Sequence, residues 1–493
     1  MTPPVQILFA TPEVAPFAKT GGLGDVAHAL PKALHALGAD VRIIAPKYKS
    51  VAQAGAPLRL LLPEVRAQLH DRIYYAAVYE SLLPGSEVPV YLIENNYFYD
   101  RTQLYSENGR DYPDNALRFA FFCQAALWVC KGLGWRPDVI HCNDWQTALI
   151  PTYLHHLPAF TVDPFFDRIG VLFTIHNIGY QGLISKDWMP RLSLPWDTFT
   201  PQGLEFFDQV NLMKAGLVYS NLISTVSKTY AKEIQTPEFG GGLDGVLRAR
   251  ANALFGILNG IDTHEWNPKT DRYLAAPYDE HSLEAKAINK AALQKRLKLP
   301  VRSDVPLLGI VSRLVTHKGL DILLQAMDDI LKLGAQLVIL GSGDPQYEQR
   351  LSELAARHPE RLAVHIGFDN SLAHQIEAGA DIFLMPSYYE PCGLNQMYSM
   401  RYGTPPVVRK TGGLADTVFN ASPATIKSGR ATGFVFTSYT PRALTNAVQK
   451  ALKTWRNEPD LWRQLQRNGM RRDFSWTQSA LQYLKLYSSL RPS

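Results

Sequence analysis

Residues 381–418 read DIFLMPSYYEPCGLNQMYSMRYGTPPVVRKTGGLADTV, and this segment is the most informative about the fold. The four apolar residues Ile382–Met385 predict a strand that is buried on both faces. A polar loop carrying Glu390 follows, and Gly393 is predicted to open a helix. Val407-Val408 predicts a second buried strand, and its loop ends in Gly412-Gly413 at another helix start. The alternation of strand and helix predicts an α/β fold with a parallel sheet.

The two strand ends bring an anion-binding backbone and a carboxylate to one edge of that sheet. Glycines at a helix N-terminus let an anion approach free backbone N–H groups, where the helix dipole also favours negative charge. Glu390 cannot bind phosphate, so it must face a neutral group with hydroxyls. A sugar phosphate or a nucleotide sugar fits both requirements.

The same alternation occurs twice along the 493 residues, a length that favours two or three domains. In the first half, strands are predicted at Val5–Ala10, Val41–Ala45, Val139–Cys142, Val171–Ile175 and Leu222–Val226, with helices at Gly22–Leu37 and Asn115–Lys131 and short alternating strands such as Ile73–Tyr79 and Val90–Ile93. In the second half, strands are predicted at Leu307–Val311, Leu337–Leu340 and Ala363–Ile366, with helices at Gly319–Leu331, Tyr347–His358 and Ser371–Ala378, and Pro441–Tyr487 is predicted to be helical. The pattern changes around Gly256–Asp262, so we expect one Rossmann-like domain at 1–258 and a second at 259–472. Two such domains facing across a cleft would bind a ligand at the carboxyl ends of their strands.

One short motif occurs in both halves. Lys19-Thr20-Gly21-Gly22-Leu23 is repeated as Lys410-Thr411-Gly412-Gly413-Leu414, each time between a strand and a helix. Two copies are too few for a solenoid. They indicate that each domain offers a Gly-Gly helix start to the ligand.

Composition excludes several classes of protein. A formal charge of +5 with no Lys/Arg run argues against nucleic acid and membrane surfaces as partners. We see no signal peptide, and no apolar run reaches the ~20 residues that span a bilayer. The four cysteines have no metal-ligand spacing and suit a thiol-keeping cytoplasm, and neither a metal nor another cofactor is predicted.

Three cations are candidates for holding an anion. Lys19 precedes the first Gly pair, and Arg313 and Lys318 follow the strand Leu307–Val311. Each could be a solvated surface charge. However, a helix start is an unfavourable place for cations because the dipole there is already positive. Arg313 and Lys318 therefore make more sense with an anion between them.

The remaining candidates gain weight from their joint position. Asp144, His176, Glu390 and Thr411 each come after an apolar strand, at the edge where such folds bind ligands. Each alone could be a satisfied polar residue, or a helix-start acid in the case of Glu390. Cys392 lacks a base partner in the sequence and is interpreted as a packed or ligand-lining thiol.

The sequence argues against the interpretation that the chain binds a dinucleotide such as NAD. The run Gly22–Ala27 fits the G-x-G-x-x-G/A fingerprint, which requires an acid near the end of the second strand for the ribose. Here that strand ends in Ala45-Pro46-Lys47.

Taken together, the motifs resemble those of the bacterial glycogen synthase and plant starch synthase family. The resemblance covers essentially the whole chain. Its most specific parts are KTGGLGDV at 19–26, HCNDW at 141–145, TIHN at 174–177, LNGID at 258–262, SRL at 312–314 with Lys318-Gly319, Pro386-Ser387 with EPCGL at 390–394, and KTGGLAD at 410–416. It implies a GT-B fold and a retaining glycosyltransferase that moves glucose from ADP-glucose to the non-reducing end of glycogen or another α-1,4-glucan, without a metal. It also implies that the final segment, 473–493, is a helix that returns to the first domain.

The resemblance also assigns roles to single residues. Arg313 and Lys318 match the cations of the diphosphate, and Lys19 with the backbone at Gly22 matches further donor contacts. The groups that match those around the transferred glucose are Glu390, the backbone of Cys392, Gly393 and Leu394, His176 and Asn259. Thr411 and Gly412 belong to the second Gly-Gly helix start. Asp144 matches a carboxylate near the acceptor, and Phe368 stands where an aromatic, often Tyr, stacks on the base. Many relatives of this fold carry a second Glu at the position of Tyr398, which is usual in the glycogen synthase branch.

Three other interpretations stay open at this stage. One is a different retaining glycosyltransferase that uses a UDP-sugar such as UDP-glucose and a smaller acceptor. The second is an NAD-dependent enzyme, and the third is a non-catalytic glucan-binding protein. The missing acid argues against NAD, and the complete set of Lys19, Arg313, Lys318 and Glu390 argues against the binding protein.

Overall fold

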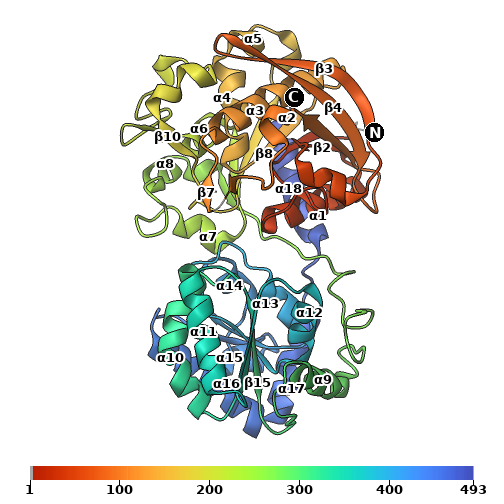
Figure 1. The fold of residues 1–493 in the computed structure, drawn as a ribbon, viewed down its shortest axis with the longest axis vertical. Coiled ribbons are helices and arrows are strands. Elements are labelled where there is room, and N and C mark those ends of the chain that lie inside the picture. The colour runs from red at the N-terminus through yellow and green to blue at the C-terminus, as the bar shows by residue number, and fades with distance from the viewer. Residues whose placement is uncertain (1–3, 108, 492–493) are drawn as a thin grey trace. The chain divides into compact units, whose positions relative to one another are not determined.

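The computed structural model describes residues 4–107 and 109–491, which form two compact units. Unit 1 comprises Met1–Val226, Ala231–Leu258 and Trp476–Ser493, and unit 2 comprises Ser227–Tyr230 and Asn259–Ser475. The chain therefore enters unit 2 briefly at Ser227–Tyr230, and the end of the chain folds with unit 1 from Trp476 onward, three residues after the predicted start of that segment. Each unit is drawn in Figure 1.

Unit 1 is built on a nine-stranded sheet in the order β14-β13-β9-β8-β1-β2-β5-β4-β3. The strands are β1 (Gln6–Ala10), β2 (Asp40–Pro46), β3 (Arg59–Leu69), β4 (Arg72–Leu82), β5 (Pro89–Glu94), β8 (Val139–Asn143), β9 (Gly170–Ile175), β13 (Leu222–Thr225) and β14 (Leu254–Gly256). Its helices are α1 (Gly22–Ala36), α2 (Asn96–Tyr99), α3 (Asn115–Gly132), α4 (Leu149–His156), α5 (Pro158–Thr161), α6 (Leu212–Tyr219), α8 (Asp244–Ala249) and α18 (Trp476–Leu490), and α7 (Lys228–Glu233) begins in the segment assigned to unit 2. Two small sheets join β6 (Ser106–Glu107) to β7 (Arg110–Asp111), and β10 (Leu183–Ser185) and β11 (Glu205–Phe206) to β12 (Gln209–Asn211). The predicted βαβ start is confirmed, because β1 pairs in parallel with both β2 and β8.

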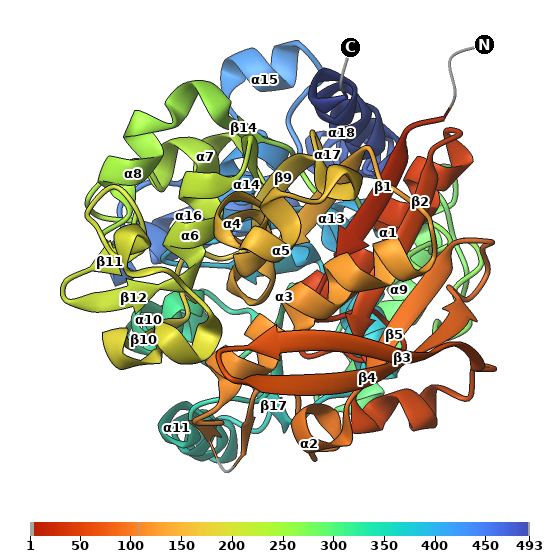
Figure 2. The same ribbon diagram turned by 90° about the horizontal axis from the view of Figure 1, so that it is seen from above.

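The long hairpin of β3 and β4 differs from the prediction. Short strands such as Ile73–Tyr79 were expected, whereas each strand of the hairpin is 11 residues long and antiparallel to the other. Leu60 of β3 and Ile73, Tyr75 and Leu82 of β4 are exposed, so neither sequence has the strict alternation of a half-buried strand along its whole length. Figure 2 shows the two strands beside α3, and Leu62 of β3 lies against Gly132 of that helix.

Unit 2 is built on six parallel strands in the order β17-β16-β15-β18-β19-β20. The strands are β15 (Leu307–Val311), β16 (Gln336–Gly341), β17 (Leu362–Ile366), β18 (Ile382–Met385), β19 (Pro406–Arg409) and β20 (Phe434–Phe436). The helices are α9 (Lys286–Arg296), α10 (Leu320–Lys332), α11 (Pro345–Arg357), α12 (Asn370–Gly379), α13 (Asn395–Arg401), α14 (Gly412–Thr417), α15 (Pro423–Lys427), α16 (Pro441–Asn457) and α17 (Pro459–Met470). β15 and β18 have the predicted bounds, and the predicted α/β class with parallel sheets is confirmed.

Helices cover both faces of this sheet, which is why its strands are continuously apolar. Leu308 and Ile310 of β15 pack in the core that includes α10, α11 and α16, whereas Leu307 of the same strand packs with α9 and α12. In Figure 1, α10 and α11 lie on one side of β15 and α9 and α12 on the other. A strand that must be apolar on both faces cannot alternate, and the short apolar runs in the sequence follow from this.

Two helices start or end differently from the prediction. Gly393 does not open α13, because its φ of +68° is left-handed; the helix begins two residues later, at Asn395. The segment predicted to be helical over Pro441–Tyr487 is divided into α16, α17 and α18. Among the described residues, no helix has both the length and the apolar character to cross a bilayer.

Candidate active site

The carboxyl ends of β15, β18 and β19 bring the predicted residues of unit 2 to one edge of its sheet. Parallel pairing joins β15 to β18 and β18 to β19, so the loops that follow the three strands emerge on the same side. Arg313 lies in the first loop, Glu390 in the second and Thr411 in the third. Thr411 is buried and is the N-cap residue of α14.

Lys318 and Glu390 form the central contact of this edge. The Lys318 ammonium donates to Oε2 of Glu390 at 2.6 Å, and the Ser387 hydroxyl donates to the same oxygen at 3.1 Å. The side chains of Lys318 and Glu390 are only 18% and 7% exposed. A buried carboxylate needs such partners, because an unpaired charge there would cost several kcal/mol, about 3–5. Ser387 belongs to a motif of the family resemblance and directly follows the strand and Pro386, but the sequence assigned it no role.

A cavity of about 220 Å³ lies beside this ion pair. Its lining includes Arg313, Lys318, Ser387, Glu390, Gly393 and Leu394. Arg313 is exposed and forms no ion pair with any other described residue. The cavity therefore combines an available guanidinium with one buried acid, which suits a ligand with both an anionic and a hydroxylated part.

His317 adds a neutral ring to this region. Burial, together with the charges of Lys318 and Arg313, lowers the pKa of His317 to about 4. The ring stacks on Tyr389 with the centroids 5.1 Å apart. It therefore stays uncharged near neutral pH and leaves Arg313 and Lys318 as the local cations.

The glycine pair at the start of α14 packs directly against the loop that carries Glu390. The N–H of Gly413 donates to the carbonyl of Glu390 at 3.1 Å, and a Cβ on Gly413 would lie 2.0 Å from the carbonyl oxygen of Cys392. Gly412 has φ +42°, and its Cβ would lie 1.9 Å from the Glu390 carbonyl oxygen. These glycines are needed for packing of backbone on backbone, in addition to any contact with a ligand.

Cys392 and Asn259 meet behind the same loop. The thiol is 5% exposed, and burial raises the pKa of Cys392 to about 12 although the backbone N–H of Asn259 lowers it. The thiol is therefore a packed group, not a nucleophile. Oδ1 of Asn259 is buried and has no hydrogen-bond partner among the described residues, so it can accept a hydrogen bond from a ligand.

Unit 2 also holds the segment Ser227–Tyr230, which sequence reasoning missed. The Ser227 hydroxyl donates to the carbonyl of Pro391 at 2.6 Å. The Asp416 carboxylate accepts from the backbone N–H of Thr229 at 2.9 Å and from its hydroxyl at 2.6 Å. This segment thus supports both the Glu390 loop and α14, over a sequence separation that no local pattern reveals.

In unit 1, the Gly-Gly start of α1 is open. Nothing lies within 4 Å of a Cβ placed on Gly22. Lys19 forms an ion pair with Asp25 at 2.6 Å, with the side chains 47% and 40% exposed. An ion pair this exposed contributes little to stability, so a phosphate could replace Asp25 as the partner of Lys19.

Glu13 orders this loop and was not predicted. Its carboxylate accepts from the backbone N–H and hydroxyl of Thr20 at 2.7 and 2.6 Å, and from the N–H of Gly21 at 3.2 Å. The Tyr105 hydroxyl also donates to it at 2.8 Å. The carboxylate is buried, and it holds the turn before α1 from the end of the first strand.

Asp144 and His176 lie together at the ends of β8 and β9. The backbone N–H of His176 donates to Oδ1 of Asp144 at 2.8 Å, and Nε2 of His176 lies 2.9 Å from Oδ1 of Asn143. Burial raises the pKa of Asp144 to about 7, partly opposed by the backbone N–H groups of His176 and Asn177. Burial lowers the pKa of His176 to about 3. His176 is therefore a neutral hydrogen-bonding group, and Asp144 can hold or release a proton near neutral pH.

Phe368 is not brought to the cavity. It follows β17, is 89% exposed and does not line the cavity beside Glu390. Over residues 4–107 and 109–491, no group of three or more His, Cys, Asp or Glu side chains is placed to hold a metal ion.

Two protein-family models match the chain. Residues 6–249 match the starch synthase catalytic domain, and residues 293–471 match the glycosyl transferases group 1. Together they cover the six-stranded sheet of unit 2 and all strands of the nine-stranded sheet of unit 1 except β14.

Curated relatives and a solved structure match over nearly the full length. The chain is 50% identical to a glycogen synthase of Syntrophotalea carbinolica, with 98% of each chain covered, and 49% identical to one of Anaeromyxobacter dehalogenans, with 99% and 100% covered. The catalytic domain of starch synthase IV from Arabidopsis thaliana, solved with ADP and acarbose bound, is 36% identical and superimposes with a TM-score of 0.90 over 99% of both chains. A sucrose-phosphate synthase from Thermosynechococcus elongatus, 20% identical with a TM-score of 0.60, shares the fold.

Proposed function

Because this chain belongs to the glycogen synthase and starch synthase family of GT-B glycosyltransferases, we propose that it transfers glucose from ADP-glucose to the non-reducing 4-OH of an α-1,4-glucan such as glycogen, with retention of configuration. The observation that carries the proposal is the cavity of unit 2, in which Lys318 and Arg313 adjoin the buried carboxylate of Glu390. A nucleotide sugar needs cations for its diphosphate and an acceptor for its sugar hydroxyls. This cavity supplies both.

Arg313 and Lys318 would hold the diphosphate. As the bond between glucose and ADP breaks, negative charge grows on the phosphate oxygen that was bonded to the glucose. Two cations and the N-terminus of α14, at Thr411 and Gly412, stabilise that charge without having to move during the reaction. Positive groups placed in advance are worth more in a cavity that excludes water. This is the main catalytic contribution that we assign to unit 2.

Glu390, Asn259 and the backbone of Cys392–Leu394 would hold the glucose. Glu390 uses Oε2 for Lys318 and Ser387, which leaves Oε1 to accept from a sugar hydroxyl. Oδ1 of Asn259 has no partner in the part of the chain that the structure describes, and it can accept from a second sugar hydroxyl. Hydrogen bonds to buried acceptors select a hydroxylated ligand strongly, because an analogue without the hydroxyl leaves the acceptor unpaired.

Unit 1 would contribute His176, Asp144 and the start of α1. The neutral His176 ring suits a sugar hydroxyl, and Asp144 suits the acceptor hydroxyl. Lys19 and the backbone of Gly22 would contact the donor phosphates. The acceptor hydroxyl would pass its proton to the leaving phosphate, so that no further base is required.

A donor and acceptor panel tests the proposal. Transfer of labelled glucose from ADP-glucose and from UDP-glucose is measured onto glycogen and onto glucose, with and without a chelator. We expect transfer from ADP-glucose to glycogen, unchanged by the chelator. Preference for UDP-glucose and a small acceptor would favour the alternative glycosyltransferase, and glycogen binding without ADP release would favour a glucan-binding protein. The proposal also places the enzyme in the cytoplasm, where its four buried free thiols stay reduced.

A further inference from the structure

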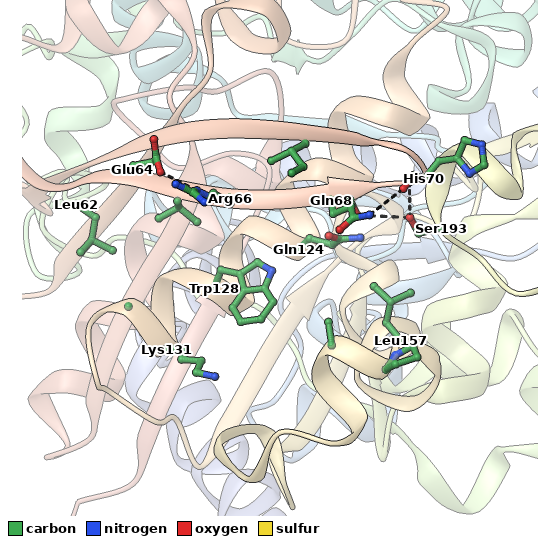
Figure 3. Close-up of a pocket in the computed structure, with 15 residues that line it drawn as sticks. Leu62, Glu64, Arg66, Gln68, His70, Gln124, Trp128, Lys131, Leu157 and Ser193 are labelled. Carbon is green, nitrogen blue, oxygen red and sulfur yellow. Dashed lines mark hydrogen bonds and ion pairs between the residues drawn. The ribbon is translucent and has the colours of Figure 1, made fainter.

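The cavity beside Glu390 is lined by backbone that a residue outside the cavity holds in place. Gly393 and Leu394 belong to the lining of this cavity of about 220 Å³. A larger cavity of about 690 Å³ lies in unit 1 between the β3–β4 hairpin and α3, and none of the residues assigned to the donor or the acceptor lines it (Figure 3). The positioning of the donor therefore depends on the smaller cavity.

Two neighbouring backbone N–H groups in the loop after Glu390 are free. Gly393 has a left-handed φ of +68°, and Leu394 follows in the right-handed region with φ −116° and ψ −35°. Successive residues of opposite hand turn their N–H groups to the same side and form a concave site for an anion or another acceptor. Neither N–H group has a hydrogen-bond partner among the described residues, so both are available to a ligand.

Gln396 holds the carbonyl side of the same two peptides. Its side chain is fully buried, and Nε2 donates to the Cys392 carbonyl at 3.1 Å and to the Gly393 carbonyl at 3.0 Å. In a trans peptide the C=O and the N–H point in opposite directions. Because both carbonyls are turned toward Gln396, the N–H groups of Gly393 and Leu394 point away from it. Gln396 lies outside the lining of the cavity, so these N–H groups point toward the cavity.

The same amide also reaches the glycine pair of α14. Nε2 of Gln396 donates to the buried Thr417 hydroxyl at 3.1 Å, and that hydroxyl donates to the Gly413 carbonyl at 2.6 Å. The N–H of Gly413 in turn donates to the Glu390 carbonyl at 3.1 Å. One amide therefore joins the loop that the proposed function assigns to the glucose to the helix start that it assigns to the diphosphate.

The surroundings of the Gln396 amide fix its orientation. Nε2 faces three oxygen acceptors, and turning the amide over would place Oε1 against the same three oxygens. Oε1 is buried and has no hydrogen-bond partner within the described part of the chain. A Cβ on Gly393 would lie only 2.5 Å from Oε1, so the amide also packs against this glycine. An unpaired buried oxygen destabilises a fold, so it is the N–H donors of glutamine that this position uses.

We propose that Gln396 is a positioning residue for the donor. Its amide aims the N–H groups of Gly393 and Leu394 into the cavity and holds their loop against the start of α14. Gln396 lies behind this loop and acts on the donor only through the backbone. The proposal rests on the proposed function, because it assumes that the donor binds beside Glu390.

Two substitutions separate the N–H donors of Gln396 from its volume. Gln396→Glu keeps the shape but turns a carboxylate oxygen toward the three oxygen acceptors, and Gln396→Met keeps the length without a polar group. Gln294→Glu is the matched control, because Gln294 is 1% exposed in the same unit. Nε2 of Gln294 donates to the Arg302 carbonyl and to Oε1 of Gln336, which begins β16 at the opposite edge of the sheet. Thermal unfolding measures whether each variant is folded.

Initial rates at several ADP-glucose concentrations, with glycogen in excess, give kcat and KM for each variant. We expect both Gln396 variants to lower kcat/KM about 10²-fold, because small displacements of positioning groups have effects of this size. Gln294→Glu should keep the kinetics of wild type even where its Tm falls. Kinetics of wild type in folded Gln396→Met, or equal losses in Gln396→Met and Gln294→Glu, would overturn the proposal.

The pH dependence gives a measurement that a loss of stability alone would not change. The carboxyl that Gln396→Glu introduces is buried, and the charges of Glu390 and Asp416 act on the neighbouring Cys392, so its pKa should be raised. Only its protonated form can donate a hydrogen bond. The kcat/KM of Gln396→Glu relative to wild type should therefore rise at least threefold from pH 8 to pH 6, whereas that of Gln396→Met should stay constant. A constant ratio for Gln396→Glu would contradict the role of the N–H donors.

Titration calorimetry with ADP tests the same role without turnover. The Kd for ADP should rise about tenfold in Gln396→Met and stay unchanged in Gln294→Glu, because the displaced backbone loses hydrogen bonds to the phosphates. If wild type binds ADP but transfers no glucose, the proposed function fails while this comparison still decides the role of Gln396. A wild type that binds no ADP would overturn both proposals.

Discussion

At the scale of single residues, the contact of Lys318 with Glu390 is central. Each side chain pairs with the charge of the other and is also a candidate to bind the ligand. The ammonium neutralises a carboxylate that is almost fully buried, and it is also a candidate cation for the diphosphate. Removing the Lys318 ammonium should therefore lower both the stability of the fold and the rate of the reaction. The two effects can be separated by measuring both.

We predict that Lys318→Ala lowers glucan synthesis about 10²–10³-fold, because one preorganised charge contact to the leaving phosphate is lost. Release of ADP from ADP-glucose with glycogen present measures this, and circular dichroism measures the folded fraction. Lys332→Ala is the matched control, since Lys332 is 77% exposed in the last turn of α10. Near-normal synthesis by folded Lys318→Ala would remove Lys318 from the mechanism.

The raised pKa of Asp144 leads to a prediction about how the stability of the fold depends on pH. Burial raises the pKa of this carboxyl from 3.8 to about 7, so the folded chain keeps the proton over a range in which the unfolded chain has lost it. The stability contributed by the neutral carboxyl is complete below about pH 4 and is lost as the pH rises toward 7. Asparagine is neutral at every pH. We therefore expect Asp144→Asn to have the Tm of wild type at pH 4, a growing advantage from pH 4 to 7, and a constant advantage above that.

Thermal unfolding at several pH values measures this advantage. Asp167→Asn is the control, because the Asp167 carboxylate is 69% exposed in the same unit. Equal slopes for the two variants would show that Asp144 is not neutral in the folded chain.

At the scale of elements, the two Gly-Gly helix starts have the same sequence but different surroundings. A methyl group on Gly413 of α14 collides with the Cys392 carbonyl, whereas one on Gly22 of α1 meets nothing within 4 Å. The repeated motif therefore serves packing in one unit, and in the other it keeps a surface open.

We predict that Gly413→Ala lowers both Tm and activity, because it displaces the loop of Glu390. Gly22→Ala should leave Tm unchanged or slightly raise it, since alanine restricts the unfolded chain and nothing obstructs it in the helix. Its KM for ADP-glucose should nevertheless rise if a phosphate approaches that backbone. Kinetics that match wild type in Gly22→Ala would show that α1 does not contact the donor.

At the scale of the whole molecule, the end of the chain completes the core of its beginning. α18 packs in the same core as β1, α1 and β2. The Tyr487 hydroxyl lies 2.8 Å from Nδ1 of His141, whose Nε2 lies 2.6 Å from the Thr174 hydroxyl. Burial lowers the pKa of His141, so the ring stays neutral and needs both partners.

We predict that Tyr487→Phe destabilises the protein by about 1–3 kcal/mol, because it leaves a buried ring nitrogen of His141 without a partner. Urea unfolding followed by fluorescence measures the change. Ser489→Ala, at an exposed position on the same helix, should change stability by less than about 0.5 kcal/mol. A Tyr487→Phe variant as stable as wild type would mean that water replaces the hydroxyl.

Much of the fold could be predicted from local sequence. β15 and β18 were predicted at their observed bounds, because a buried parallel strand is a short apolar run between polar residues. The β3–β4 hairpin was predicted too short, since a partly exposed antiparallel pair carries no such signal. Arg313, Lys318 and Glu390 were placed at one cavity by the same rule that places loops after parallel strands.

Local patterns were therefore sufficient to predict the alternation of strands and helices, the family, and the residues that follow the strand ends. The polar groups that support these residues become apparent only in the folded chain. Glu13 holds the turn before α1, Ser387 shares Oε2 of Glu390 with Lys318, and Asp416 binds Thr229 across a separation of 187 residues. The physical reason is that burial and backbone pairing impose short periods on a sequence, whereas a hydrogen bond between distant segments imposes none.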